Sequence, residues 1–475
     1  MSRYLISSIR NLATSSLAMI SMFAVVSGCF AASEIPVGTG ESVKERIAEA
    51  SEGDTIVISP GVTIEPLLIR KSIHLRGSGS GRVDCGPLII QADDVTVENL
   101  APGGDDIAVM RIERVSGVTI RNCLIRNTNR DHLGYGLKAQ TVSNLVIENC
   151  RVHDNSVGLL LAEASGVHVS GCDIRNDNDG IIIADESRDI EISDCYIHRH
   201  QGQGRPGAHA DGIQTFRTVD NLTIRNCQLL GNMQHMHFES TTGILIEDCI
   251  CFGSSANGVS FAWRNTTDAT ITRSTLGYSG LSLLNMTAHG YSLTENILVS
   301  GHSKPCLVTI GVDELVSDEN LFWNTVRADS PMMAASEVRY HRDFSEYQEA
   351  SGYDQNSVYT DPGFANAPLA IASINPKRFN LLTHSWIPIW GHIAMFQVGD
   401  TIEIGFDGVV RKCLEIRDEG IVIDPPLAEL PSNAVMVTTW GENENLQLNL
   451  SRPGQPNGHR PGYVSAEAPV QSSSK

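Results

Sequence analysis

Six cysteines recur at the same point of a repeated phrase, and this repeat constrains the fold more than any other feature of the sequence. Each phrase alternates β-branched and polar residues up to its cysteine, and successive cysteines are 27, 22, 23, 32 and 22 residues apart. A period of about 22 residues with such alternation indicates short coils stacked one on the next. Because one coil cannot bury its own apolar side, the stack is predicted to form a β-solenoid. The six are Cys123, Cys150, Cys172, Cys195, Cys227 and Cys249.

The repeated phrases, such as VTIRNCLI around Cys123 and LTIRNCQL around Cys227, resemble the right-handed parallel β-helix proteins of the pectate-lyase-like superfamily. The stretch GESVKERIAEASEGDTIVISPGVTI is similar to their usual opening, in which a short helix (Ser42 to Ala50) caps the solenoid. The phrase DPGFANA…FNLL (Asp361 to Leu382) resembles their usual exit. The resemblance implies an all-β solenoid of bacterial polysaccharide-processing type. It is weak for activity, because the fold hosts lyases, hydrolases, epimerases, phage spikes and adhesins.

Four segments are predicted along the chain. Residues 1–28 read as a signal peptide, and residues 36–385 as the parallel β-helix with its N-terminal helix cap. Residues 386–445 contain FQVGDTIEIGFDGVVRKCLEIRDEGIVIDPPL, whose period-two alternation and turn signals predict a small antiparallel β module. Residues 452–475 are rich in proline, glycine and serine, and this composition is typical of a disordered tail.

The N-terminus predicts export. Arg3 and Arg10 precede an apolar run (Leu17 to Val26) that is too short for a convincing membrane span. The run ends in Val-Ser-Gly-Cys29, which resembles a lipobox, so lipidation of Cys29 would anchor the chain to a membrane. Ordinary cleavage after Ala31 is the alternative. We therefore expect an outer-membrane or cell-surface lipoprotein, or a periplasmic or secreted protein.

Charge and cysteine usage limit the partners. The formal net charge is −20 and the pI is about 5.1, which argues against nucleic acid and against membrane contact other than a lipid anchor. A local basic groove for an acidic polysaccharide stays compatible with this average. The six cysteines in register are expected to form a buried column of free thiols, because directly stacked neighbours are poorly oriented for disulfides. We expect a monomer.

Counting back from each cysteine aligns one strand across five coils. Alternation places one set of residues inward: Leu137, Leu159, Ile181, Ile213 and Met236. The outward column between them is Lys138, Leu160, Ile182, Gln214 and His237. Two coils carry extra residues just before this strand, at 127–134 and 198–210. Insertions in a solenoid tend to map to the binding face, so we expect the site over this column.

Candidate catalytic residues lie on two neighbouring coils. His209 and Asp211 begin the phrase HADGIQ, which resembles H-x-D-G-I-Q phrases of uncharacterised bacterial β-helix proteins that look like polysaccharide-processing enzymes. One coil later, His235, His237 and Glu239 are predicted on one strand face. Imidazoles and a carboxylate at this spacing could bind a divalent metal or exchange protons. Solvated turn residues are the alternative interpretation.

Further residues are candidates for substrate and metal. Lys138 lies three coils from Gln214, about 14 Å, which suits a distant sugar subsite. Cations near the long insertion could neutralise a sugar carboxylate, and Trp263 could stack on a sugar ring. Asp177 and Asp179 could ligate calcium, the one cofactor considered, although Asp/Asn runs also make turns. The cations are Arg199, Arg205 and Arg264.

The first functional hypothesis is an exported enzyme that acts on an acidic polysaccharide or oligosaccharide by β-elimination or C5-epimerisation. Both reactions need a base, here His209 or His237, and a positive charge beside the uronate carboxylate. A glycoside hydrolase with Asp211 and Glu239 as its carboxylate pair is the second hypothesis. A non-catalytic cell-surface carbohydrate-binding or structural solenoid is the third. The catalytic phrases of polygalacturonases and alginate epimerases are not recognisable, so no activity is carried over residue by residue.

Overall fold

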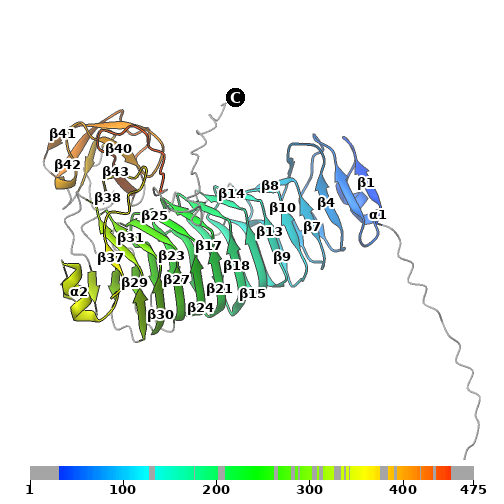
Figure 1. The fold of residues 1–475 in the computed structure, drawn as a ribbon. Helices are drawn as coiled ribbons and strands as arrows, with labels where there is room; N and C mark the ends of the chain where they lie inside the picture. The colour runs from blue at the N-terminus through cyan, green and yellow to red at the C-terminus, as the bar shows by residue number, and fades with distance from the viewer. Residues whose placement is uncertain are drawn as a thin grey trace, which may run out of the picture.

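The chain folds into a long stack of parallel β coils with a smaller β module beside its C-terminal half (Figure 1). The structure is a computed structural model. It describes residues 32–127, 134–175, 177–201, 209–261, 266–279, 284–286, 289–301, 307–309, 314–325, 333–335, 339–341, 343–374, 383–389, 393–417, 419–431 and 435–450.

Strands follow one another around each coil on three faces. The first and second faces join in a 25-stranded sheet, and the third face is a 12-stranded sheet. The first face consists of β3 (Leu67–Ile69), β6 (Leu88–Ile90), β9 (Ala108–Glu113), β12 (Tyr135–Ser143), β15 (Val157–Ser170), β17 (Asp179–Ala184), β20 (Asp211–Phe216), β23 (Gln234–Phe238), β26 (Val259–Phe261), β29 (Leu284–Met286), β32 (Leu307–Thr309) and β35 (Met333–Ala335). An antiparallel strand, β36 (Arg339–His341), pairs with β35.

The other two faces are equally regular. The second face takes in the later part of β15 and also β1 (Glu34–Val37), β2 (Thr55–Ile58), β4 (His74–Gly77), β7 (Thr96–Glu98), β10 (Thr119–Arg121), β13 (Val146–Glu148), β18 (Ser187–Ser193), β21 (Val219–Arg225), β24 (Thr241–Glu247), β27 (Thr267–Thr272), β30 (His289–Thr294) and β33 (Leu315–Asp318). The third face consists of β5 (Val83–Cys85), β8 (Leu100–Gly104), β11 (Leu124–Asn127), β14 (Arg151–His153), β16 (Asp173–Arg175), β19 (Tyr196–His198), β22 (Gln228–Leu230), β25 (Ile250–Ser254), β28 (Thr275–Ser279), β31 (Ile297–Ser300), β34 (Leu321–Asn324) and β37 (Val358–Tyr359).

Among the residues that the structure describes, two short helices flank the stack. Helix α1 (Val43–Glu49) is the predicted N-terminal cap, and the Ser42 hydroxyl accepts a hydrogen bond from the Glu45 N–H at its start. Buried Val43 and Ile47 of this helix join the solenoid core. Helix α2 (Phe344–Ser351) lies at the far end and terminates at Gly352, which adopts φ 73°.

The predicted cysteine column is confirmed. All cysteines in the part of the chain that the structure describes are free and buried. Each thiol of the column donates to carbonyl oxygens, as Cys172 does to Ile147 O at 3.7 Å and to Ser170 O at 3.3 Å. The core therefore repeats from coil to coil with its weak donors satisfied. The inward residues Leu137 and Ile213 are also fully buried, which confirms the strand alternation.

A second column inside the stack is polar. It occupies the bend between the third and first faces and is referred to below as the inner polar ladder: Asn127, Asn155, Asp177, His200 and Asn232. Three rungs accept a backbone N–H from the next rung of the ladder: Asn127 N donates to Asn155 Oδ1 at 2.7 Å, Asn155 N to Asp177 Oδ1 at 2.5 Å and His200 N to Asn232 Oδ1 at 3.0 Å. Glycines pack against the ladder, and a Cβ on Gly158 would lie 2.8 Å from Asp177 Oδ2. The ladder thus satisfies buried backbone groups where the chain turns.

The C-terminal module is a six-stranded antiparallel sheet, as the alternation predicted, but it begins earlier than expected. Its strands, in spatial order, are β38 (Ala370–Ile374), β43 (Val435–Thr439), β40 (Thr401–Ile404), β41 (Arg411–Arg417), β42 (Gly420–Asp424) and β39 (Trp386–Pro388). A 3-10 turn, η2 (Ile393–Met395), precedes β40. Strand β38 belongs to this sheet, so the border at residue 385 was wrong. The expected exit segment crosses into the module because β38 pairs with β43.

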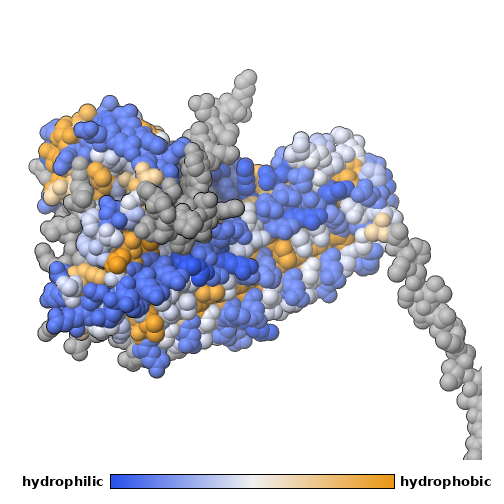
Figure 2. All heavy atoms as spheres, in the orientation of Figure 1, coloured by the Kyte–Doolittle hydropathy of each residue, from blue (hydrophilic) through white to orange (hydrophobic). Residues whose placement is uncertain are grey.

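The module docks on the third face through apolar side chains. Phe406, Met436 and Trp440 of the module join one buried cluster with Phe252 and Tyr278 of the solenoid. On the face shown in Figure 2, hydrophilic and hydrophobic residues form bands along the stack, because each outward column continues from coil to coil. Within the described residues, no helix combines the length and apolar character needed to cross a membrane.

Candidate active site

His209 and Asp211 form a hydrogen-bonded pair where the chain enters β20. His209 Nδ1 lies 2.9 Å from Asp211 Oδ2. The Asp211 side chain is completely buried, whereas half of the His209 side chain is exposed. The Asp211 carboxylate therefore holds an imidazole that remains accessible, and this hydrogen bond raises the pKa of His209 above its ordinary value of 6.5.

Two amides and a second carboxylate hold Asp211 in place. Gln234 Nε2 donates to Asp211 Oδ1 at 3.0 Å, and Asn257 Nδ2 donates to Gln234 Oε1 at 3.1 Å. The Asp211 backbone N–H donates to Asp179 Oδ1 at 3.0 Å. Gln234 Nε2 also contacts the His209 ring at Nε2. Both carboxylate oxygens of Asp211 are thus occupied by protein donors.

His237 and Glu239 form the second pair, one coil further on. His237 Nε2 lies 3.0 Å from Glu239 Oε1, and the His237 side chain is only 9% exposed. Thr215 positions Glu239, because its hydroxyl accepts the Glu239 backbone N–H at 3.1 Å. His237 Nδ1 is buried without a hydrogen-bond partner. This orphaned nitrogen is a polar atom that a ligand would satisfy.

The two pairs are direct neighbours. The rings of His209 and His237 meet edge to face, with their centroids 5.2 Å apart. Gln214 lies opposite His237 in the parallel register of β20 and β23. The structure therefore brings His209, Asp211, Gln214, His237 and Glu239 together on two neighbouring coils.

His235 differs from its expected place. It was predicted on the same face as His237, but it is 1% exposed and lies inside the coil, where Asn232 Nδ2 contacts its Nδ1 at 3.1 Å. Its neighbour in register one coil earlier is Gly212, at the bend beside the inner polar ladder. Strand alternation does not apply through this bend, so the side chain turns inward. Burial lowers the pKa of His235 to about 3.

The outward column runs away from the pairs toward the N-terminus. It leads from His237 through Gln214, Ile182 and Leu160 to Lys138, which is four coil steps or about 19 Å from His237. Ile182 packs in a small apolar cluster with Val157 and Ala184, flanked by half-buried side chains that include Leu160 and Phe216. Lys138 therefore stands apart from the two histidines.

The remaining substrate candidates are not assembled with the pairs. Arg199 lies at the junction with the module, near Glu403. Burial raises the pKa of Glu403, and the positive charge of Arg199 partly opposes this shift. Arg205, Trp263, Arg264 and Cys29 lie outside the described residues.

The calcium expectation is not supported by the placement of its ligands. Asp177 is completely buried in the inner polar ladder, where its Oδ1 accepts from Asn155 N and Nδ2. Burial raises its pKa well above the ordinary value, which favours the neutral acid. Asp179 accepts the Asp211 N–H instead. Among the residues that the structure describes, no three His, Cys, Asp or Glu side chains are grouped to hold a metal ion.

Comparison with known proteins defines the fold family. The family model described as right handed beta helix region matches residues 69–206 and 108–276. The matched residues form part of the parallel coils described above, so the chain has a right-handed parallel β-helix fold. This confirms the resemblance noted in the sequence at the level of fold. The chain has no significant match among curated proteins.

Solved structures similar to this β-helix protein differ in activity. The PL6 family alginate lyase AlyGC is 13% identical (TM-score 0.47, 70% of this chain and 54% of that chain). The A-module of the Azotobacter vinelandii mannuronan C-5 epimerase AlgE6 is 15% identical (TM-score 0.42, 68% and 96%). PfbA, a surface adhesin of Streptococcus pneumoniae, is 9% identical (TM-score 0.45, 60% and 86%). The chain spans about half the length of the alginate lyase.

Sequence reasoning about the β-helix missed Gln234 and Asn257. Gln234 lies directly opposite Asp211 in the parallel register, one residue before His235, where the aligned segment of this coil begins. Extending the coil alignment by one position would have placed an amide beside the buried carboxylate. Asn257 offers no such signal, because it lies in a turn between strands β25 and β26.

Proposed function

We propose that this protein is an exported enzyme that removes the proton beside the carboxylate of a uronate in an acidic polysaccharide, by β-elimination or C5-epimerisation. The observation that carries the proposal is the contact between two imidazoles, each hydrogen-bonded to its own carboxylate. Both reactions need one group to take a proton and another to donate one or to stabilise the negative charge that develops.

His237 is the base in this proposal. With the Nε2 proton donated to Glu239, the neutral imidazole carries its lone pair on Nδ1. That nitrogen is the orphaned atom described above, so no protein donor has to be displaced before it accepts a proton. Glu239 fixes the tautomer and stabilises the imidazolium that forms, the role of a carboxylate beside a catalytic histidine.

His209 is the acid. Asp211 raises its pKa, so the imidazolium form persists to higher pH than for an isolated histidine. A positive charge on this ring, which touches the ring of His237, would lie beside the substrate carboxylate and stabilise an enediolate. His209 can then donate its Nε2 proton to the leaving oxygen or to the carbanion, which requires the Gln234 amide that contacts Nε2 to give way to the substrate.

Hydrolysis through Asp211 and Glu239 is less compatible with the geometry. Asp211 is completely buried, and its two oxygens accept from His209 and Gln234. A glycosidase needs both carboxyl groups at the scissile bond, one as acid and one as base or nucleophile. Asp211 has no free oxygen to offer a sugar.

The test is a screen of the purified protein on uronate polysaccharides. Elimination creates an unsaturated uronate with new ultraviolet absorbance, and epimerisation in D2O places deuterium at C5. The variant His237→Ala should lower either rate by at least about 10²-fold, the typical contribution of a positioned acid or base. His168→Ala is the matched control, since His168 is an exposed histidine paired with Glu191 on the second face.

The outcomes separate the three hypotheses. New reducing ends without unsaturation or deuterium would favour a hydrolase. Binding without any chemical change, unaffected by His237→Ala, would favour a non-catalytic solenoid.

We also propose that Cys29 is lipidated during export, on the strength of the Val-Ser-Gly-Cys phrase. Cys29→Ser should move the protein from the membrane fraction to the soluble fraction of its native-like host. A mature protein that begins at Ala32 or Ser33 with no lipid would contradict the proposal.

A further inference from the structure

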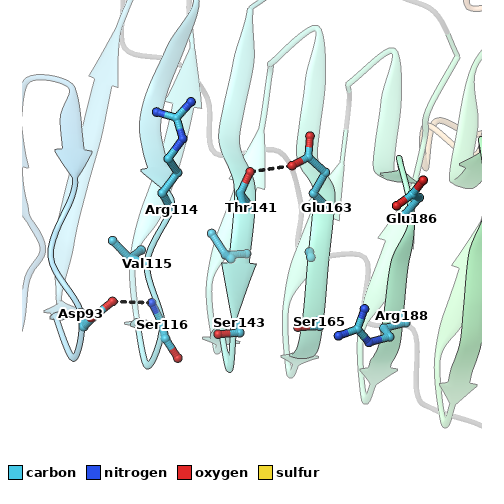
Figure 3. Close-up of a pocket in the computed structure, with 12 residues that line it drawn as sticks. Asp93, Arg114, Val115, Ser116, Thr141, Ser143, Glu163, Ser165, Glu186 and Arg188 are labelled. Atoms are coloured by element: carbon cyan, nitrogen blue, oxygen red, sulfur yellow. Dashed lines mark hydrogen bonds between the residues drawn. The ribbon is translucent and has the colours of Figure 1, made fainter.

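A groove runs along the bend between the first and second faces, in the N-terminal half of the stack (Figure 3). It is open to solvent along its length, has a volume of about 620 Å³ and is lined entirely by described residues. Val115, Val142 and Ala164 form its buried floor, one from each of three successive coils. The groove is separate from the histidine pairs, because none of its lining residues belongs to β20 or β23.

Two polar rows flank the floor, as Figure 3 shows. One row is a column of serines on three successive coils. The backbone of Ser116 pairs with that of Ser143, and the backbone of Ser143 with that of Ser165, both in parallel register. Arg188 continues this row on the next coil, and Asp93 precedes it, bonded to the Ser116 N–H at 2.7 Å. Successive members are therefore about 4.8 Å apart, so the row spans about 19 Å. The opposite row is Arg114, Thr141, Glu163 and Glu186.

The opposite row has an unusual backbone. Its four residues adopt left-handed conformations, with φ between 51° and 62°. Such a conformation favours glycine, asparagine and aspartate, and it is most costly for a β-branched residue such as Thr141. The two other left-handed columns of the same coils follow this rule: one is Gly117, Asn144, Gly166 and Asp189, and the other is Asn122, Asn149, Gly171 and Asp194. In the coils that line the groove, the groove row differs from these two columns because it keeps longer side chains at a conformational cost.

Several polar groups of the groove lack protein partners. Within the described residues, no ion pair or side-chain hydrogen bond engages Arg114 or Glu186. The Ser143 and Ser165 hydroxyls are likewise without partners there. Thr141 donates to Glu163 Oε2 at 2.7 Å, which leaves Oε1 available. The groove thus presents donors and acceptors at regular intervals above an apolar floor.

We infer that this groove binds a neutral oligosaccharide chain that lies along the stack. Sugar hydroxyls both donate and accept, so they match carboxylates, guanidinium groups and serines alike, while the C–H face of the ring packs on valine and alanine. The lining holds three carboxylates (Asp93, Glu163, Glu186) against two guanidinium groups (Arg114, Arg188). This excess of negative charge disfavours a polyuronate. The site is therefore distinct from the histidine pairs in position and in ligand.

Calorimetric titration with tetrasaccharides of glucose and of mannose, and with tetragalacturonate for comparison, tests the inference. At least one neutral tetrasaccharide should bind. The variants Arg114→Asn and Glu163→Asn should weaken it about tenfold or more, because each removes hydrogen bonds to a charged group. Both should leave the unfolding temperature unchanged or raised, since asparagine suits the left-handed conformation.

Matched controls distinguish the groove from other sites. Arg217→Asn changes an exposed arginine with φ 59° on the next coil, outside the groove lining, and should leave binding intact. His237→Ala should also leave it intact. The inference is overturned if no neutral tetrasaccharide binds, if the groove variants bind as well as the wild type, or if tetragalacturonate is the ligand that they lose.

Discussion

His209 and His237 have the same chemistry but different surroundings, and the difference assigns their roles. His209 is half exposed and bonded to a buried carboxylate, whereas His237 is nearly buried and bonded to a partly exposed carboxylate. A buried anion that cannot be solvated favours the charged imidazolium beside it. His209 is therefore suited to remain protonated, and His237 to accept a proton at Nδ1.

A pH profile tests this division of roles. If His209 must be protonated, the rate falls as pH rises through its raised pKa. Asp211→Asn removes the carboxylate that raises this pKa, so the alkaline limb of the profile should move to lower pH, toward or below the ordinary value of about 6.5. The measurement is the initial rate on a uronate polymer from pH 5 to 9. An alkaline limb that stays in place would show that His209 does not act as the acid.

At the scale of elements, the inner polar ladder contains one carboxylic acid, Asp177, at a position where most other rungs are asparagine. Asn155, Asn232 and Asp177 each pack one polar atom against a glycine of the preceding coil. A Cβ built on that glycine would lie 3.0 Å from Asn155 Nδ2, 3.1 Å from Asn232 Nδ2 and 2.8 Å from Asp177 Oδ2. Asp177 Oδ2 is buried without a partner, so an acceptor stands where its neighbours present a donor. Protonation turns that oxygen into a donor, which agrees with the raised pKa of Asp177.

We predict that Asp177→Asn stabilises the fold at neutral pH. The raised pKa of Asp177 favours the protonated group in the folded protein, while the unfolded chain ionises above pH about 4, so the wild type loses stability as pH rises above that value. Asparagine continues the ladder without titrating, and a gain of about 1 kcal/mol or more is expected at pH 7. Chemical denaturation at pH 7 and pH 4 measures it. The gain should shrink at pH 4, and a loss of stability at both pH values would contradict this account.

The cysteine column makes a separate prediction. The contact with the Cys150 thiol acts to lower the pKa of Cys172, but the contact with the Cys195 thiol and burial together raise it far above the ordinary range, and the thiol is already bonded to carbonyl oxygens. Such thiols should not react in the folded protein, because the thiolate is the reactive form. A thiol reagent should label almost none of the column in native protein and nearly all of it after denaturation without reductant. Extensive pairing after denaturation would contradict the column of free thiols.

The sequence predicted regular parts of the structure and failed where the chain bends. The 22-residue period identified the coils, the cysteine column and the outward position of His237, because strand alternation is fixed by backbone geometry. It misplaced His235 and Asp177. Both lie at the bend where glycines pack against the inner polar ladder, and strand alternation is interrupted there. It also missed the start of the module at β38, because a short apolar strand looks the same in a parallel coil and in an antiparallel sheet.

At the scale of the whole molecule, the contacts between the module and the solenoid should couple the unfolding of the two parts. The apolar cluster that includes Phe252, Tyr278 and Met436 is continuous across the junction. Tyr278 also donates its hydroxyl proton to the Pro368 carbonyl. We therefore expect the module and the adjoining coils to unfold together.

Met436→Ala tests this coupling. The side chain is fully buried in the junction, so its truncation should cost about 2–5 kcal/mol. The transition of the whole protein should shift to lower temperature as one event. A first transition confined to the module, with the solenoid transition unmoved, would show that the two parts unfold independently. Leu430→Ala, at an exposed module residue, is the control.

The same junction contains a carboxyl group that should make its stability depend on pH. Glu403 is 2% exposed, and burial raises its pKa to about 7. Gly408 N donates to its Oε1 at 3.0 Å and Trp440 Nε1 to its Oε2 at 3.1 Å. Asp407 raises this pKa further, while Arg199 of the solenoid opposes the shift.

The sign of the pH effect follows from the direction of the shift. The folded pKa lies above the unfolded value of about 4.3, so the stability from the protonated group is complete below pH 4 and is lost as pH rises through about 7. The full loss is up to about 3 kcal/mol between pH 4 and pH 8. Glu403→Gln cannot ionise, so its unfolding free energy should change less over this range than that of the wild type. Glu429→Gln, at an exposed module residue, should retain the wild-type slope. If the Glu403→Gln slope equals that of the wild type, the carboxyl group is ionised in the folded protein and the junction accommodates its charge.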